Sequence, residues 1–331
     1  MTRPIDQLRA RLDEIRPPPT GTPSFTVIVR TQGSRPCSLA EALASLAAQT
    51  HHSFDVIVTV HSDDATTAGR VEADARAATI PEATRFIAVS GGGRSHPLNV
   101  GLAEASGDYV CFLDDDDLAM PDWLSTFARA LSNNPGTVVR AATQSQAWTT
   151  DGGVEPVRPA GPIERPFAPT FDLLAHFSHN ETPICSIAVP RLLLSDANIT
   201  FDEELPVYED WDLLMRVAML AGVVSIPDET SLYRRLDGGN AGTIETVAIW
   251  EASHGTVLDR LSAMPLLLPP GDARRLASAH FDIDGGSRHD RELVDARQEI
   301  DALTKSPVRW LVRFARRASG AARTRLSARR P

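Results

Sequence analysis

The strongest constraint on the fold is an apolar run that ends in four carboxylates. Residues 109–113 (YVCFL) are followed without a break by the aspartates of 114–117. An apolar run of this length, entered through a glycine, is typical of a buried strand in a mostly parallel sheet. The aspartates then lie at the carboxyl end of that strand, which is the edge where open α/β sheets bind ligands. The run therefore predicts both a central strand and the position of a site.

The four adjacent carboxylates repel one another and resist ionising together unless positive charge lies among them. A divalent cation is the simplest source of that charge, and hard oxygen ligands favour Mg²⁺ or Mn²⁺. Alternate side chains of an extended chain point the same way, so Asp114 and Asp116 are the expected ligand pair. The alternative is an acidic loop that is merely solvated.

Strands and helices alternate around this run. Strands are expected at 25–29, 54–60, 85–89 and 138–142, and helices at 39–49, 68–79, 97–105, 171–177, 190–196 and 208–222. Strand, helix and strand in this order form right-handed βαβ units. A Pro- and Gly-rich passage at 151–169 is expected to be a long irregular loop, and such loops are usually functional or disordered.

Charge is distributed unevenly along the 331 residues. The net charge is −10, but residues 305–331 hold nine basic residues and no acidic ones, which leaves the rest of the chain at −19. An acidic body is a poor partner for nucleic acid. The basic segment also contains Trp310 and Phe314, so it is expected to contact an anionic membrane surface; a disordered basic tail or an intramolecular helix is the alternative.

The two ends of the chain are expected to lie outside the main domain. Residues 1–22 predict a short helix and a Pro-rich linker, and residues 245–331 predict a helical region with a basic amphipathic tail. Three cysteines without metal-ligand spacing indicate a reducing compartment. No apolar run approaches the roughly 18 residues of a spanning helix. The expected location is cytoplasmic, at or near the inner face of the membrane.

The order of several short motifs resembles glycosyltransferase family 2. They are VIVRT at 27–31, LASLAAQT at 43–50, NVGLAEASGDYV at 99–110, FLDDDD at 112–117, MPDWL at 120–124, FDE at 201–203, EDWDLLMR at 209–216 and YR at 233–234. The shared order is more specific than any single match. It implies the GT-A fold, an α/β architecture with a Rossmann-like, mostly parallel sheet flanked by helices, here with a C-terminal helical extension.

That resemblance divides the chain and assigns the donor side. It implies a GT-A domain over 23–244, with a nucleotide-sugar half at 23–118 and an acceptor half at 119–244. The donor-side residues and their implied roles are Asp114 and Asp116 as the Asp-any-Asp metal motif, Asp115 toward the donor ribose, Thr31 beside the nucleoside base, and Asn99 as the asparagine of the donor-side helix.

Two departures from the family pattern concern the nucleotide. The family usually has an acidic residue directly after the second strand, and Asp63 is the expected substitute in this chain. The family commonly places an arginine before the helix asparagine, where this chain has Leu98, and Arg94 in the glycine run 90–94 is the expected substitute. Arginine suits this role because its fork-shaped guanidinium matches phosphate oxygens.

The acceptor side depends on the pair Glu209 and Asp210. Acids in a first helical turn commonly just complement the helix dipole. In the resembled family the pair faces the acceptor, so Asp210 is the expected general base and Glu209 the reserve. With a metal neutralising the departing diphosphate, the hydroxyl attacks the anomeric carbon directly and configuration inverts. Arg234 or Arg235, in the family's closing strand at 226–235, is expected to reach the diphosphate; the alternative is surface charge.

The predicted function is therefore an inverting, metal-dependent glycosyltransferase. Its expected partners are a nucleotide-sugar donor and a glycan or lipid-linked acceptor, as in the synthesis of cell-surface glycans or glycolipids. A non-catalytic sugar-nucleotide-binding module is one alternative. A nucleotidyltransferase is another, and residues 31–35 (TQGSR) are a faint version of the Gly-rich basic loop that such enzymes use for triphosphate.

Overall fold

The structure, a computed structural model, describes residues 21–150, 155–195, 197–236, 247–264, 268, 271–276 and 278. The predicted N-terminal helix, the helical segment at 290–304 and the basic tail lie outside these residues. The chain forms two compact units, Met1–Leu268 and Pro269–Pro331. The sheet, the helices and the cleft described below all belong to the first unit.

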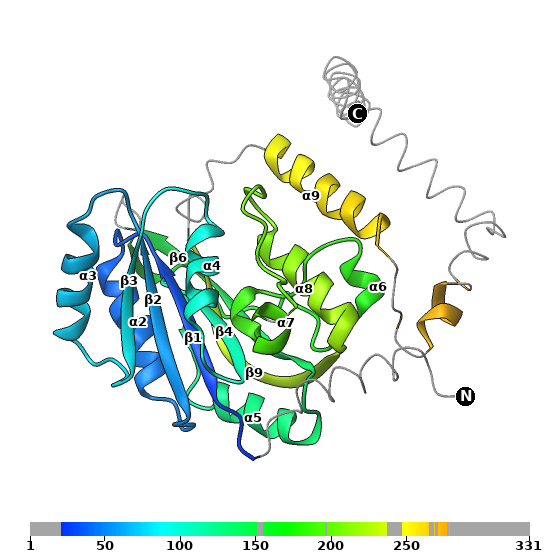
Figure 1. The fold of residues 1–331 in the computed structure, drawn as a ribbon, viewed down its shortest axis with the longest axis horizontal. Coiled ribbons are helices and arrows are strands. Elements are labelled where there is room, and N and C mark those ends of the chain that lie inside the picture. Colours follow the sequence, from blue (N-terminus) through cyan, green and yellow to red (C-terminus); the bar gives the residue numbers. More distant parts are fainter. Residues whose placement is uncertain are drawn as a thin grey trace, which may run out of the picture. The chain divides into compact units, whose positions relative to one another are not determined.

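Four parallel strands form one half of the sheet, in the order β3-β2-β1-β4 (Figure 1). They are β1 (Phe25–Thr31), β2 (Phe54–His61), β3 (Thr84–Val89) and β4 (Tyr109–Asp114). Each of these predicted strands is confirmed. β1 lies in register between β2 and β4, so Arg30 is directly opposite Asp114. The carboxyl ends of β1, β2 and β4 therefore meet at one edge.

The sheet continues beyond β4 in the order β8-β6-β9-β5, with β7 paired to β6. These strands are β5 (Leu118–Ala119), β6 (Val138–Thr150), β7 (Pro156–Pro159), β8 (Ile187–Pro190) and β9 (Val223–Leu236). β8 is antiparallel to both β4 and β6, whereas β6 and β9 run parallel. β6 continues well past its predicted end at 142, because β9 and β7 give its outer part hydrogen-bonding partners.

The passage predicted as an irregular loop at 151–169 is partly strand. β7 lies within it and pairs antiparallel with the end of β6. Ser145 and Glu164 form a further bridge, with N···O distances of 2.9 and 2.7 Å. Proline is tolerated in β7 because an edge strand needs no hydrogen-bond donor on its outer side. Composition alone does not show this, since the partner strand is what makes the segment extended.

Helices cover both faces of the sheet. They are α2 (Pro36–Ala47), α3 (Thr67–Arg76), α4 (His96–Glu104), α5 (Trp123–Asn133), α6 (Leu173–His176), α7 (Arg191–Ser195), α8 (Glu209–Ala221) and α9 (Val247–Ser262). The first half agrees with the prediction that strands and helices alternate. Among the described residues, no helix combines the length and the apolar composition that crossing a bilayer requires.

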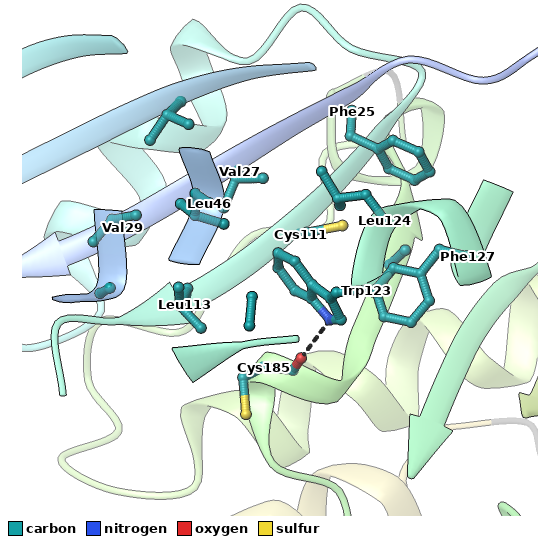
Figure 2. Packing of buried hydrophobic residues seen from close by; sticks show 14 of the residues in the cluster. Phe25, Val27, Val29, Leu46, Cys111, Leu113, Trp123, Leu124, Phe127 and Cys185 are labelled. Carbon is teal, nitrogen blue, oxygen red and sulfur yellow. Dashed lines mark hydrogen bonds between the residues drawn. The ribbon is translucent and has the colours of Figure 1, made fainter. Parts of the chain in front are cut away.

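Alternate side chains of the central strands enter two different cores. Val27 and Cys111 pack with residues of α2, α3 and α5, whereas Ile28 and Phe112 pack with residues of α4, α7 and α8. Figure 2 shows the first core, in which the Trp123 indole nitrogen donates to the Cys185 carbonyl at 3.0 Å. Because both faces are buried, the central strands have continuous apolar sequences rather than alternating ones.

α9 packs against α8 and closes a third core. Val257 and Leu261 of α9 contact the buried side chains of Trp211 and Met215. Arg260 adds a hydrogen bond of 2.6 Å to the buried carboxylate of Asp212. α9 was expected to belong to the C-terminal region, and it lies in the same compact unit as the sheet. The domain boundary at residues 244–245 stays a prediction.

Gly107, at the entry to β4, allows a test of this packing. A Cβ atom at this position would lie 2.5 Å from the Phe25 carbonyl carbon and 2.6 Å from the Thr26 nitrogen. These are backbone atoms, so they cannot rotate away. We expect Gly107→Ala to lower the free energy of unfolding by about 1–3 kcal/mol, the usual cost of overpacking. Urea denaturation followed by circular dichroism measures the change.

Gly69, in α3, provides the matched control. A Cβ atom on Gly69 would have no atom within 4 Å, and alanine is the better helix former. Gly69→Ala should leave stability unchanged or raise it by up to about 1 kcal/mol. Equal effects of the two substitutions would contradict the close approach of β1 to Gly107.

Candidate active site

A cleft of about 680 Å³ opens at the carboxyl edge of β1, β2 and β4. Its walls come from both halves of the domain, including the start of α8, the end of β9 and one side chain of α9. Eight of the eleven candidate site residues line it: Thr31, Arg94, Asp114, Asp115, Asp116, Glu209, Asp210 and Arg235. The carboxylates at the strand ends and the residues predicted for the acceptor side therefore line the same cavity.

Arg30 connects the two sides of this cleft. Its Nε and Nη2 atoms donate to the two carboxylate oxygens of Asp114 at 3.1 and 2.9 Å. Its Nη1 atom donates to Glu209 at 3.2 Å and to the Arg94 carbonyl at 3.0 Å. Burial raises the pKa of Asp114, but the charge and hydrogen bonds of Arg30, together with the charges of Arg94 and Arg35, outweigh this effect and leave that pKa lowered. Asp114 is therefore ionised at neutral pH.

Arg35 provides positive charge beside the next two aspartates. Its Nη1 atom lies 3.2 Å from Asp115 and forms a salt bridge with Asp116. The Thr31 hydroxyl donates a short hydrogen bond to the other oxygen of Asp115. Burial still dominates, and it raises the pKa of Asp115 to about 7 even though Arg35 opposes the shift. Burial also raises the pKa of Asp116.

The fourth aspartate faces the protein instead of the cleft. Asp117 is buried and accepts a hydrogen bond of 3.0 Å from the backbone N–H of Arg234. Burial and the neighbouring carboxylate of Asp116 raise its pKa well above the usual range. The predicted need for positive charge among the aspartates is thus met by two arginines, while the fourth carboxyl group favours its neutral form.

Glu209 and Asp210 have different surroundings although they are adjacent. Glu209 is buried and forms ion pairs with Arg30 at 3.2 Å and with Arg94 at 2.9 Å. Asp210 forms no ion pair with any described residue, and its Oδ1 atom accepts the Trp211 N–H at 2.7 Å. Burial, together with repulsion from Glu209, raises the pKa of Asp210 to about 7. Asp210, like Asp115, can therefore exchange a proton near neutral pH, and of the two it is Asp210 that lies in the first turn of α8.

Tyr208 sets the direction in which α8 begins. Its φ angle is +66°, in the left-handed region that non-glycine residues seldom adopt. Such strain persists only where the surroundings enforce it, and it is commonly found at functional sites. The Tyr208 ring packs edge-to-face against Trp211 and Trp250, with centroid distances of 5.3 and 4.9 Å. Glu209 and Asp210 follow directly after this turn, and both line the cleft.

Asp63 and Asn99 lie outside the cleft lining. Asp63 accepts the Gly91 N–H at 2.9 Å and so stabilises the glycine turn. The Asn99 amide exchanges two hydrogen bonds of 2.9 Å with the backbone of Phe201. Both side chains are occupied by backbone groups, and the residue of β2 that does line the cleft is His61.

The two candidate arginines of the closing strand point in opposite directions, because successive side chains of a strand alternate. Arg234 is fully buried, donates to Glu41 at 2.6 Å and lies 4.9 Å from the Trp148 ring centroid. This geometry corrects the expectation that Arg234 contacts the donor. Arg235 lines the cleft and pairs with Glu164 at 2.5 Å.

The sequence motifs did not single out Arg30 or Arg35 as site residues. Arg30 could have been found from its place one residue before Thr31, because parallel strands that end together bring it beside Asp114. Arg35 follows Gly33, whose φ of +72° turns the loop, and Arg70 holds the Gly33 carbonyl at 3.0 Å. Its position depends on this tertiary contact, which no local pattern reveals.

The carboxylates of the cleft suit a divalent cation that is shared with a substrate. Among the described residues, no group of three or more His, Cys, Asp or Glu side chains could hold a metal ion by itself. Asp114 and Asp116 nevertheless present hard oxygens to the same cavity. Mg²⁺ and Mn²⁺ commonly bind through one or two carboxylates while substrate phosphates complete the coordination. The residues present therefore fit such an ion.

Comparison with known proteins identifies the class. The sequence model of glycosyl transferase family 2 matches residues 26–185, a span that contains β1 to β4 and the four aspartates. Together with the cleft, this match shows that the chain is a glycosyltransferase with the GT-A fold. Its residues 26–185 carry the domain of glycosyltransferase family 2, as the motif order predicts.

Two curated relatives agree with this class. An uncharacterized glycosyltransferase of Bacillus subtilis, YwdF, is 25% identical over 72% of this chain and 82% of its own length. A glucosyl-dolichyl phosphate glucuronosyltransferase of Haloferax volcanii is 28% identical over 34% of each chain.

Solved structures share the fold. TarS of S. aureus, residues 1–349 with UDP-GlcNAc, aligns with a TM-score of 0.50 at 22% identity and covers 72% of this chain and 71% of that one. The mannosyltransferase PcManGT of Pyrobaculum calidifontis, solved with GDP-Man and Mn²⁺, aligns with a TM-score of 0.52 at 17% identity, covering 98% of this chain and 95% of that one.

The bridge made by Arg30 has a measurable effect on stability. Replacing Arg30 by methionine removes the partner of Asp114 and one of the two partners of Glu209. Breaking a buried ion pair from one side usually costs about 3–5 kcal/mol, because a charge is left unpaired. We expect Arg30→Met to lower the free energy of unfolding by about that amount at pH 7.5, as measured by urea denaturation.

Arg76 provides a matched control, since it pairs at 2.8 Å with Glu72 on the surface of α3. Exposed pairs of this kind contribute about 0.2–1 kcal/mol. Arg76→Met should therefore change stability by less than about 1 kcal/mol. A loss at Arg30 no larger than the loss at Arg76 would mean that the bridge does not hold the cleft together.

Proposed function

We propose that this enzyme is an inverting, metal-dependent glycosyltransferase that moves a sugar from a nucleoside-diphosphate donor to a hydroxyl group. One observation carries the proposal. Asp114 and Asp116 line the same cleft as Asp210, whose pKa is raised to about 7. A metal-binding pair and a proton acceptor thus face one cavity, which is the arrangement that transfer to a hydroxyl requires.

The donor is proposed to bind at the ends of β1 and β4. Asp114 and Asp116 would hold Mg²⁺ or Mn²⁺, which when bound neutralises negative charge on the diphosphate. Thr31 and Asp115 already share a hydrogen bond there, and they are proposed to contact the nucleoside. Arg94 lines the cleft and pairs with Glu209. Support for a nucleotide-sugar donor comes from the TarS and PcManGT structures, which contain UDP-GlcNAc and GDP-Man.

Asp210 is proposed to remove the proton of the acceptor hydroxyl. A general base works best when its pKa is close to the working pH. Glu209 is less suited to act as the base, because it already forms ion pairs with Arg30 and Arg94. These different surroundings support Asp210 as the base in preference to Glu209, and Glu209 is proposed to position Arg30 and Arg94.

The ion pairs of the cleft carboxylates favour inversion of configuration at the anomeric carbon. A retaining mechanism by double displacement needs a carboxylate nucleophile beside the anomeric carbon in addition to the acid–base group. Among the described residues that line the cleft, Asp114, Asp115, Asp116 and Glu209 all pair with arginines, and Asp210 alone lacks one. Direct attack by the hydroxyl therefore suits the site better. We also propose that the enzyme acts in glycan or glycolipid synthesis, which the glycosyltransferase relatives support.

Asp210→Asn tests the assignment of the base. The substitution keeps the size of the side chain but removes its ability to accept a proton. We expect the transfer rate to fall about 10²- to 10⁴-fold, the usual contribution of a general base. Donor affinity should stay unchanged, because Asp210 forms no ion pair with any of the described donor-side residues and asparagine keeps its size. Initial rates of nucleoside-diphosphate release and donor titration measure the two quantities.

Asp228→Asn is the control for this substitution. Asp228 is an exposed aspartate on β9, 3.8 Å from Arg129, and it does not line the cleft. Its replacement should leave the transfer rate unchanged. If Asp210→Asn kept a rate similar to that of Asp228→Asn, the base would have to be another group.

The pH dependence of transfer follows from the same pKa. Asp210 must be ionised to accept a proton, so lowering the pH below about 7 should reduce the rate about tenfold per unit, and the rate should level off above it. The pH profile of the transfer rate at saturating donor checks this. Asp115 has a similar pKa, so the variant is needed to tell the two groups apart. The residual rate of Asp210→Asn should lack the inflection near pH 7 if Asp210, rather than Asp115, controls the rate. An inflection near pH 4 in the wild type would contradict the raised pKa.

A further inference from the structure

The acceptor side of the cleft contains a group of aromatic side chains that the mechanism above does not use. Four rings that line the cleft, those of Phe167, Tyr208, Tyr233 and Trp250, are all half-buried. They form two edge-to-face pairs. Tyr208 and Trp250 have a centroid distance of 4.9 Å at 82°, and Phe167 and Tyr233 have 6.3 Å at 68°. We call these four residues the aromatic wall.

The aromatic wall combines residues that are far apart in sequence. Phe167 precedes α6, Tyr208 precedes α8, Tyr233 belongs to β9 and Trp250 belongs to α9. Tyr208, Tyr233 and Trp250 lie beyond the span 26–185 that the family model matches. The wall is therefore built largely by the part of this chain that the family domain does not define.

α9 holds Trp250 through contacts that do not involve the Trp250 side chain. The His254 ring stacks on Trp211 at 5.2 Å and 28°, and its Nε2 atom lies 3.0 Å from the Ser178 carbonyl. Further along the helix, Val257 and Leu261 are buried in the third core. The helix is thus fixed at several points, and replacing Trp250 should not release it.

The cleft is divided by charge. The cations Arg30, Arg35 and Arg94 come from the donor side. Of the described lining residues that follow residue 160, the one cation is Arg235, and Glu164 neutralises it at 2.5 Å. Arginine commonly binds phosphate groups through two parallel hydrogen bonds. The aromatic wall therefore lacks the charge that an anionic acceptor group would need.

We propose that the aromatic wall is the acceptor subsite and that it binds the ring of a neutral pyranose. This inference rests on the proposed function and adds the acceptor class to it. The C–H bonds on one face of a pyranose carry small positive charges, and aromatic faces are negative. Half-buried rings together with a few polar groups, here Asp210 and the Asn180 amide, are what such a ligand requires. α9 then contributes to acceptor specificity through Trp250.

The test uses the full chain with Mn²⁺ and three donors: UDP-glucose, UDP-GlcNAc and GDP-mannose. The acceptors are p-nitrophenyl pyranosides of glucose, galactose, mannose and N-acetylglucosamine, with a polyprenyl phosphate as the anionic alternative. We expect transfer to at least one pyranoside. Trp250→Ala should raise the KM for that pyranoside at least about tenfold while the donor KM and acceptor-free donor hydrolysis stay within about twofold.

Two further variants separate stacking from a structural effect. Trp250→Phe keeps an aromatic face and should restore most of the acceptor affinity. Val247→Ala, at a well-exposed position on the same helix, should leave both KM values unchanged. Melting temperatures of all three variants, measured alongside, should match that of the wild type.

Three results would overturn the inference. They are an unchanged pyranoside KM in Trp250→Ala, transfer by the wild type to polyprenyl phosphate alone, and donor hydrolysis without transfer to any pyranoside. Each of these leaves the glycosyltransferase proposal intact. A wild-type enzyme that neither hydrolyses nor transfers from any of the donors would instead overturn the proposed function, and the acceptor class with it.

Discussion

One buried guanidinium joins the two halves of the cleft. Arg30 binds Asp114 on the neighbouring strand and Glu209 at the start of a helix 179 positions later in the chain. Each of these charges would be costly to bury alone, and together they compensate one another. The bridge fixes the start of α8 against the ends of β1 and β4. The separation between the strand-end carboxylates and Asp210 is therefore set by an ion pair rather than by a flexible loop.

The same bridge gives two adjacent acids different roles. Glu209 forms ion pairs with Arg30 and Arg94, so its carboxylate is placed to position both side chains. Asp210 forms no ion pair within the described part of the chain, and burial beside the charge of Glu209 raises its pKa to about 7. In the proposed mechanism, environment rather than residue type thus separates the positioning acid from the proton acceptor. The arginines beside the aspartates of β4 likewise keep Asp114 ionised, as binding of a cation requires.

The sequence predicted the parallel half of the sheet well, because its buried strands are continuous apolar runs with helical patterns between them. Features that depend on contacts distant in the sequence could not be obtained in this way. The motif order pointed to Asp210, but the partners of Arg30 follow from strand register, and only tertiary packing shows that Arg234 points away from the cleft while Arg235 lines it. Asn99 matched a family position yet binds backbone, which the residue type alone does not reveal.

The most direct test of the site is the melting temperature of the enzyme with UDP or GDP, measured with and without Mn²⁺. A ligand that binds only the native state raises the melting temperature. If the strand-end carboxylates share a cation with a diphosphate, one nucleotide and Mn²⁺ together should stabilise the enzyme more than either alone, and Asp116→Asn should abolish the extra shift. No joint stabilisation, or an equal shift in Asp116→Asn, would contradict a donor site at these carboxylates.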